Sequence, residues 1–308
     1  MASTPTLLWV GLGNMGRGMC KNIVEKGSLK SPLLLFNRSR ERAVELSAKL
    51  TPGRTQVVET MTEGVTRADI VFTCLANDEA VEEFVAKALE SDVTGKLFVE
   101  CSTIHPDTTD AIAKAVVARG AEFVAAPVFG APAAAEAGQL IGVLAGPKSS
   151  VGRARPWFKG VMAKAEVDMS DQPYGKATTL KVLGNTFILA MVEQLAEAHV
   201  VAEKSGLDTD LLHQFVDGFF GGAYAAYSTR MLRGVYHKEG PFFGVDLARK
   251  DARHAMSLAS AAGARLKIVE IGDAHLAQVQ EHSGSAGDIA GIYGAAREEA
   301  GLKFENDA

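Results

Sequence analysis

The stretch GKATTLKVLGNTFILAMVEQLAEAHVVAEKS, residues 175–205, decides how the chain is divided. It contains no proline, and apolar residues recur in it at helical spacing, at Leu180, Leu183, Phe187 and Met191. Further apolar side chains fall on the other faces, which predicts a helix buried nearly all round. Roughly 28 residues at 1.5 Å each make a rod about 42 Å long, enough to cross a whole domain.

Two polar residues interrupt the apolar first half of this helix. Lys181 and Asn185 are four residues apart, so they share one face, one turn apart. A lysine in apolar surroundings must find a partner or reach water with its end group. Lysine is also readily tuned by burial into an acid–base catalyst. The local pattern fits a lysine that extends to solvent equally well, so the catalytic interpretation depends on the rest of the chain.

Composition limits the classes of function. The chain has 308 residues, 47% hydrophobic and 22% charged, which suits a globular protein of two domains. A net charge of −5 offers no basic surface to nucleic acid, and no apolar run is long enough for a bilayer, so we expect neither partner. The first six residues lack a basic segment, so we expect no secretory signal and a cytoplasmic protein.

Cysteines and histidines give no sign of a disulfide framework or a metal. An odd number of cysteines, with two of the three inside apolar strand-like runs, predicts reduced thiols at Cys20, Cys74 and Cys101. The seven histidines have no ligand spacing, so we expect no metal site.

A glycine-rich turn near the N-terminus lies between a predicted strand, residues 7–10, and a predicted helix, residues 17–26. Its G-x-G-x-x-G pattern allows a tight turn, close approach of a pyrophosphate, and close packing of helix on strand. The helix N-terminus also favours phosphate. We therefore predict dinucleotide binding, the alternative being a glycine-rich turn without a cofactor. The residues concerned are Gly11, Leu12, Gly13, Asn14, Met15 and Gly16.

The end of the second predicted strand, residues 33–36, indicates the form of the dinucleotide. An acidic residue at this point would bind the ribose 2′-hydroxyl of NAD, but the sequence has Asn37, Arg38 and Ser39. Arg38 would attract a 2′-phosphate, and its neighbours would add neutral donors. We predict NADP(H), the alternative being that Arg38 is a solvated charge opening the next helix.

Strand and helix patterns alternate up to about residue 170, which predicts a parallel sheet with helices on both faces. Beyond that point all segments appear helical. We therefore expect an α/β Rossmann domain over residues 1–170 and an all-α domain over residues 171–308, joined by the long helix. Ligands of such sheets bind beyond the carboxyl ends of the strands. The candidate residues there are Leu75, Ala76, Asn77, Ser102, Thr103, Phe129, Gly130 and Ala131.

These motifs, in this order, resemble the β-hydroxyacid dehydrogenase family. That family includes 3-hydroxyisobutyrate dehydrogenase, tartronate semialdehyde reductase and glyoxylate/succinic semialdehyde reductases, and is related to 6-phosphogluconate dehydrogenase. The resemblance covers nearly the whole chain. It is carried by residues 11–16, by the acid-x-Ser-Thr-Ile-x-Pro motif at 100–106, by 127–131, by the lysine motif at 175–185, by Lys250-Asp251 and by Asp288.

The resemblance implies a role for each motif. Lys181 would be the general acid in reduction and the general base in oxidation, with hydride passing between nicotinamide C4 and the substrate carbonyl carbon. Asn185 would orient the substrate and the lysine. Ser102, Thr103 and the backbone at Gly130 would hold a substrate carboxylate. Thr103 would also contact the cofactor, as would Lys250, beside the nicotinamide.

Three positions depart from the family pattern. Phe129 replaces a serine that resembles a carboxylate donor in relatives, Ala131 replaces a glycine of the same motif, and Ala177 replaces a glycine before the lysine. The first two bear on the substrate, whereas the pair Lys181 and Asn185 is intact.

We therefore expect an NADPH-dependent oxidoreductase that interconverts a small aldehyde or keto acid with its hydroxy acid. The alternatives are an imine or bulkier carbonyl reductase, suggested by Phe129, and a non-catalytic NADP-binding protein. The apolar long helix further predicts a homodimer or homotetramer.

Overall fold

The computed structural model describes residues 5–307, so residues 1–4, which contribute to the expectation about a secretory signal, lie outside it. The chain forms two compact units, one ending at Lys181 and the other beginning at Val182. Helix α8 (Tyr174–Ser205) runs through this boundary. None of the helices in residues 5–307 has both the length and the apolar character needed to cross a membrane.

The first unit is built on one sheet with the strand order β3-β2-β1-β4-β5-β6-β8-β7, and β9 pairs with β8. Strand β1 pairs in parallel with both β2 and β4, so the strand order reverses there, which is where such sheets bind ligands. The strands are β1 (Leu7–Val10), β2 (Leu33–Phe36), β3 (Thr55–Val57), β4 (Ile70–Thr73), β5 (Leu97–Glu100), β6 (Glu122–Ala125), β7 (Val128–Phe129), β8 (Leu140–Gly146) and β9 (Ala163–Ser170).

The expectation of a parallel sheet holds for β1 to β6 and for the pair β8–β9, and it is wrong for the pairs that β8 makes with β6 and β7. Strand β8 runs antiparallel to β6 and to β7. The extended segment 122–129 divides at Pro127, which has no N–H to donate to a ladder. Strands β7 and β8 are connected by residues 130–139, ten residues, fewer than the dozen or more that a parallel crossover needs.

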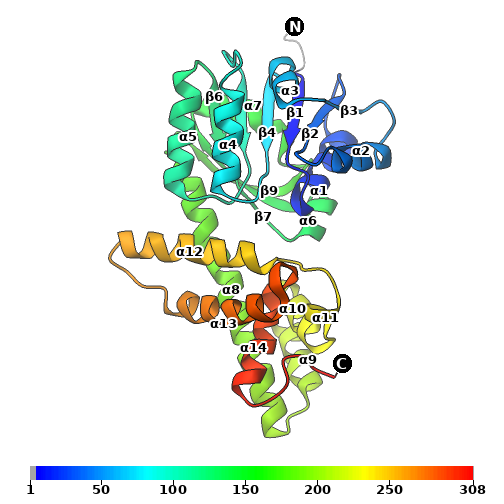
Figure 1. The fold of residues 1–308 in the computed structure, drawn as a ribbon, viewed down its shortest axis with the longest axis vertical. Coiled ribbons are helices and arrows are strands. Elements are labelled where there is room, and N and C mark those ends of the chain that lie inside the picture. Colours follow the sequence, from blue (N-terminus) through cyan, green and yellow to red (C-terminus); the bar gives the residue numbers. More distant parts are fainter. Residues whose placement is uncertain (1–4, 308) are drawn as a thin grey trace. The chain divides into compact units, whose positions relative to one another are not determined.

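Helices cover both faces of this sheet (Figure 1). Alternate residues of β1 face opposite sides, Leu7 and Trp9 towards one apolar core and Leu8 and Val10 towards the other. The first core is completed by α1 (Asn14–Lys26), α2 (Arg40–Lys49), α6 (Pro132–Ala137) and α7 (Lys148–Ala154). The second is completed by α3 (Met61–Arg67), α4 (Asp78–Ala88), α5 (Pro106–Ala118) and the start of α8.

The second unit is helical and packs around one apolar core formed with the later part of α8. Its other helices are α9 (Thr209–Phe219), α10 (Gly222–Leu232), α11 (Val235–Lys238), α12 (Val245–Ala261), α13 (Lys267–Ser283) and α14 (Ile292–Glu299). The stretch 285–300 is not one continuous helix. The side chain of Asp288 accepts from the N–H of Ala290 and caps a short 3₁₀ turn, and α14 starts only after that turn.

The prediction that the long helix is buried nearly all round is wrong. Val182 and Val192 lie in the core, but Leu183, Phe187 and Val201 are exposed, Phe187 to 76%. The sequence pattern did not distinguish these positions, because the exposed and buried residues are equally apolar.

Candidate functional site

The glycine-rich turn has the backbone that its sequence predicted. Gly11 has a φ of +98°, and a Cβ there would lie 2.2 Å from the carbonyl oxygen of Cys74. A Cβ on Gly16 would lie 2.1 Å from the carbonyl oxygen of Gly11, so helix and strand pack too closely for any side chain. The indole N–H of Trp9 donates to the carbonyl of Gly11 at 2.8 Å, which fixes the backbone of the turn.

This turn fits a dinucleotide. A Cβ added to Gly13 would meet no atom within 4 Å, so the backbone there is open to a close ligand. Helix α1 has no side-chain cap and no acidic residue in its first turn, which leaves its positive end available to a phosphate. Of the predicted residues, Gly13 and Asn14 are exposed, Met15 is half-buried, and Gly11, Leu12 and Gly16 are buried.

At the end of β2 the three predicted residues differ in their surroundings. The amide of Asn37 accepts from the N–H of Leu12 at 2.9 Å and donates to the carbonyl of Ser39 at 3.0 Å, so it fixes the loop. Arg38 and Ser39 are exposed. Within the described part of the chain Arg38 makes no hydrogen bond or ion pair, whereas the neighbouring Arg40 pairs with Glu59.

The turns that follow β4 and β5 are tied to each other. The hydroxyl of Ser102 accepts from the N–H of Leu75 at 2.7 Å. The side chain of Asn77 accepts from the N–H of Ala80 at 3.1 Å and caps α4, while Ala76 is exposed and Thr103 half-buried. Five of the predicted strand-end residues therefore lie on two turns that this bond joins, three after β4 and two after β5.

Lys181 and Phe129 are also brought together. The ammonium nitrogen of Lys181 lies 4.6 Å from the centroid of the Phe129 ring, and the lysine is buried. Phe129 is the last residue of β7 and is half-buried, and Gly130 after it has a φ of +140°. Ala131 begins α6 as its N-terminal cap.

Helix α8 is anchored in the first unit just before the lysine. The N–H of Gly175 donates to the carboxylate of Asp110 on α5 at 2.8 Å, and the hydroxyls of Thr178 and Thr109 are 3.0 Å apart. A Cβ on Gly175 would lie 2.8 Å from the same carboxylate. The glycine of the lysine motif therefore permits the close approach that fixes the start of α8.

The second unit holds Asn185 and Lys250 on one carboxylate. The amide nitrogen of Asn185 donates to Asp251 Oδ2 at 2.6 Å, and Lys250 Nζ donates to Asp251 Oδ1 at 2.8 Å. Because a carboxylate only accepts, the amide of Asn185 must turn its nitrogen towards Asp251. The other polar atom of the amide, its oxygen, can only accept. A cavity of about 10 Å³, the space of one water, adjoins Asn185, Phe243 and Asp251.

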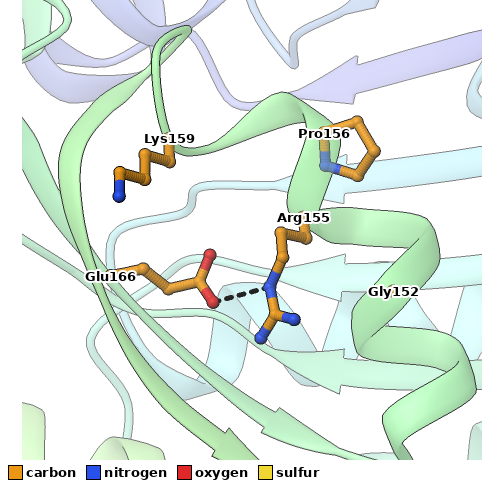
Figure 2. Close-up of a pocket in the computed structure, with 5 residues that line it drawn as sticks. All are labelled: Gly152, Arg155, Pro156, Lys159 and Glu166. Carbon is orange, nitrogen blue, oxygen red and sulfur yellow. Dashed lines mark hydrogen bonds and ion pairs between the residues drawn. The ribbon is translucent and has the colours of Figure 1, made fainter.

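A hollow of the first unit lies elsewhere, at Arg155, Lys159 and Glu166 (Figure 2). Arg155 donates to Glu166 at 2.7 Å and lies 2.7 Å from Asp168, so its charge is already balanced. None of its lining residues belongs to the motifs above, and we assign it no role. In residues 5–307 no group of three or more metal-binding side chains is gathered.

The structure adds two acidic residues that were not predicted as site residues. Asp251 was noticed only as the second member of a Lys-Asp pair, and Glu100 only as the acid preceding the Ser-Thr motif. Both are buried. A signal was available for Glu100, since a carboxylate in an apolar stretch needs a partner, whereas Asp251 stands among charged residues.

Both units match families of known proteins. Residues 6–171 match the NAD binding domain of 6-phosphogluconate dehydrogenase, and residues 175–296 match the NAD-binding domain of NADP-dependent 3-hydroxyisobutyrate dehydrogenase. An oxidoreductase of Aspergillus ustus, named as NADH-dependent, is 39% identical over 94% of this chain and 98% of its own length.

Solved structures share the arrangement of elements. The 3-hydroxyisobutyrate dehydrogenase of Mycobacterium tuberculosis, solved with L-serine, has a TM-score of 0.80 and 26% identity, covering 96% of this chain and all of its own. An imine reductase of Streptomyces aurantiacus has a TM-score of 0.63 at 18% identity, covering 96% of this chain and 99% of its own; that similarity is one of fold.

Proposed function

The chain belongs to the β-hydroxyacid dehydrogenase family and is an NAD(P)-dependent oxidoreductase, and from this premise we propose that it reduces a small aldehyde or keto acid with NADPH, reversibly. The observation that carries the proposal is the position of Lys181. It is a buried lysine whose ammonium group lies against Phe129, the last residue of β7, at the ligand-binding edge of the sheet.

In this proposal Lys181 moves the proton. Its Nζ gives a proton to the substrate oxygen in reduction and takes it back in oxidation, a contribution of about 10² to 10⁴ in rate. The nicotinamide, when bound, supplies or accepts the hydride. Asn185 acts as an acceptor, because Asp251 holds its amide nitrogen. Its oxygen can receive a hydroxyl or an ammonium proton, and so can orient either the alcohol or the lysine.

The protein would hold the cofactor through the glycine-rich turn, with Gly13 and the first turn of α1 at the phosphates. The loop from Leu75 to Asn77, with Thr103 and Lys250, completes the proposed set. Preference for NADP(H) is supported by the exposed guanidinium of Arg38, since no carboxylate of the described chain pairs with it. NADH is the second candidate, because the relative from Aspergillus ustus carries that cofactor in its name.

The remaining part of the proposal concerns the substrate. A small carboxylate could be held by Thr103 and the backbone at Gly130. Phe129 cannot donate a hydrogen bond, and its ring offers an apolar surface beside Lys181, which favours an imine or a bulkier carbonyl as the second candidate.

Steady-state assays test the proposal, with NADPH and NADH each offered glyoxylate, succinic semialdehyde, an aromatic ketone and a cyclic imine. Lys181→Met keeps the stem and removes the proton, so we expect kcat to fall at least about a hundredfold with cofactor affinity nearly unchanged. A Lys181→Met enzyme with near-normal kcat would remove the lysine from the mechanism. Tight cofactor binding without turnover on any substrate would indicate a non-catalytic protein.

Self-association is part of the same proposal. The exposed apolar side chains of α8, above all Phe187, support a homodimer or homotetramer. Light scattering on the purified protein measures the oligomeric state, and a monomer at micromolar concentration would reject it.

A further inference from the structure

Glu100 is the last residue of β5, and only 2% of it is exposed to solvent. Its Oε1 accepts from the N–H of Ser102 at 2.6 Å, and its Oε2 accepts from the hydroxyl of Thr73 at the end of β4. One buried acid therefore joins the ends of two neighbouring strands.

Ser102 continues this connection to the neighbouring turn. Its hydroxyl oxygen accepts from the N–H of Leu75 at 2.7 Å, while its backbone N–H donates to Glu100. Ser102 is itself buried. Its function is to connect the turn after β5 to the turn after β4.

We propose that Glu100 is a positioning residue for cofactor binding: its ionised carboxylate fixes the turns Leu75–Asn77 and Ser102–Thr103 together. This inference rests on the proposed function, because those turns are the ones assigned there to the cofactor. An ionised carboxylate accepts from both donors, whereas a protonated one must use one oxygen as a donor and so gives up part of this set.

The pKa of Glu100 distinguishes a role in positioning the two turns from a role in stabilising the fold. Burial raises the pKa of Glu100 to about 7, against the lowering effect of its bonds from Ser102 and Thr73; the other titratable groups around it are Cys74, Cys101 and Asp78. A carboxyl whose pKa is higher folded than unfolded binds more protons when folded, so the stability of the fold decreases as pH rises towards 7. The ionised state therefore costs stability, and a role in holding the fold does not explain it.

The test is Glu100→Gln in the full chain, with Glu122→Gln as the matched control. Glu122 begins the neighbouring strand β6, and its carboxylate also binds a serine hydroxyl, that of Ser150 at 2.6 Å, but it lies at the opposite end of the strands. The measurement is the dissociation constant of NADPH and of NADH by fluorescence titration at pH 6 and pH 8, together with the thermal midpoint at both.

We expect Glu100→Gln to bind cofactor about fivefold more weakly than the wild type at pH 8, the difference between a charged and a neutral acceptor, and equally at pH 6. Its thermal midpoint at pH 8 should not fall, and Glu122→Gln should follow the wild type in affinity. Equal affinity of Glu100→Gln and wild type at pH 8 would overturn the proposal. The proposal would also be overturned if Glu100→Gln lost the same cofactor affinity at both pH values and had a lower thermal midpoint than the wild type.

A second measurement needs no cofactor. Amide hydrogen exchange of segments 73–77 and 101–104 should accelerate in Glu100→Ala and not in Glu122→Ala. If the wild type binds neither nicotinamide cofactor, the proposed function fails, and this exchange experiment still decides the inference: no acceleration in Glu100→Ala would reject it.

Discussion

The ammonium nitrogen of Lys181 lies 4.6 Å from the centre of the Phe129 ring, a cation–π contact between the start of α8 and the end of β7. Such a contact contributes about 0.5 kcal/mol at exposed sites and about 2 kcal/mol when water is excluded. Phe129, which we expect at the serine position of the family motif, thus also touches the lysine proposed to carry the proton. The two roles can be separated by substitution.

Phe129→Ser should raise the activity of the enzyme on small carboxylate substrates. The serine adds one hydrogen bond to a charged group, so we expect kcat/KM for glyoxylate to rise by about 1–2 kcal/mol in transition-state binding, or roughly 5- to 30-fold. The same variant should lose activity on an aromatic ketone, because the apolar surface is removed. The comparison of both substrates in one steady-state assay measures the change in specificity.

Phe129→Leu is the control for that experiment. It keeps the apolar volume without an aromatic face, so it should leave glyoxylate activity low. An unchanged substrate profile in Phe129→Ser would show that the ring does not contact the substrate.

Arg38→Asp should change the cofactor preference from NADPH to NADH. Loss of one charge-assisted contact to the 2′-phosphate is worth about 1.5–3 kcal/mol, so NADPH affinity should fall roughly 10- to 150-fold while NADH binding is retained or improved. Arg42→Asp, an equally exposed charge reversal on α2, should leave the ratio of the two dissociation constants unchanged. A wild-type protein that already prefers NADH would reject the assignment of Arg38.

The fold could be predicted from the sequence because its signals are local. The apolar run before Gly11 and the glycine spacing predict the first strand, turn and helix, and the structure confirms them. The mixed part of the sheet was missed, because the direction of β8 depends on which strand it pairs with over a long range. The short helices α3, α6 and α7, six or seven residues each, leave too few turns for a periodic pattern.

In the candidate site, too, the local features could be predicted from the sequence and the long-range contacts could not. The order of its motifs could be read along the chain, whereas the partners of its polar groups could not. Glu100 meets Thr73 across a pair of strands, and Asn185 meets Asp251 across two helices. Such contacts join residues 27 and 66 positions apart, and no spacing rule connects them.

Asp251→Asn should lower kcat/KM by about 1.5–3 kcal/mol, roughly 10- to 150-fold, because Asn185 and Lys250 lose the carboxylate that holds them. The double variant Asn185→Asp with Asp251→Asn restores the bond with donor and acceptor exchanged. We expect it to recover most of the activity lost in Asp251→Asn. Additive losses in the double variant would show that Asp251 does not act through Asn185. Asp273→Asn, a partly buried partner of Arg249, is the control and should retain wild-type kcat/KM.

His275 should make the stability of the helical unit depend on pH. Its Nδ1 lies 2.7 Å from Glu193 on α8 and its Nε2 lies 3.1 Å from Glu299 on α14, so the ring satisfies both carboxylates only when both nitrogens are protonated. The bond to Glu193, more than any other cause, raises the pKa of His275 from 6.5 to about 9. The charged ring therefore joins α8, α13 and α14.

The direction of the effect follows from the raised pKa. The stabilisation is fully present below pH 6.5, the value in the unfolded chain, and is lost as pH rises through about 9. His275→Gln, which carries no charge at any pH, should therefore be less stable than the wild type at pH 6 by on the order of 2 kcal/mol, or roughly 5 °C in thermal midpoint, with the difference nearly gone at pH 10. Thermal melts of both proteins from pH 6 to pH 10 measure it. A difference that does not change with pH would mean that the ring contributes by packing alone.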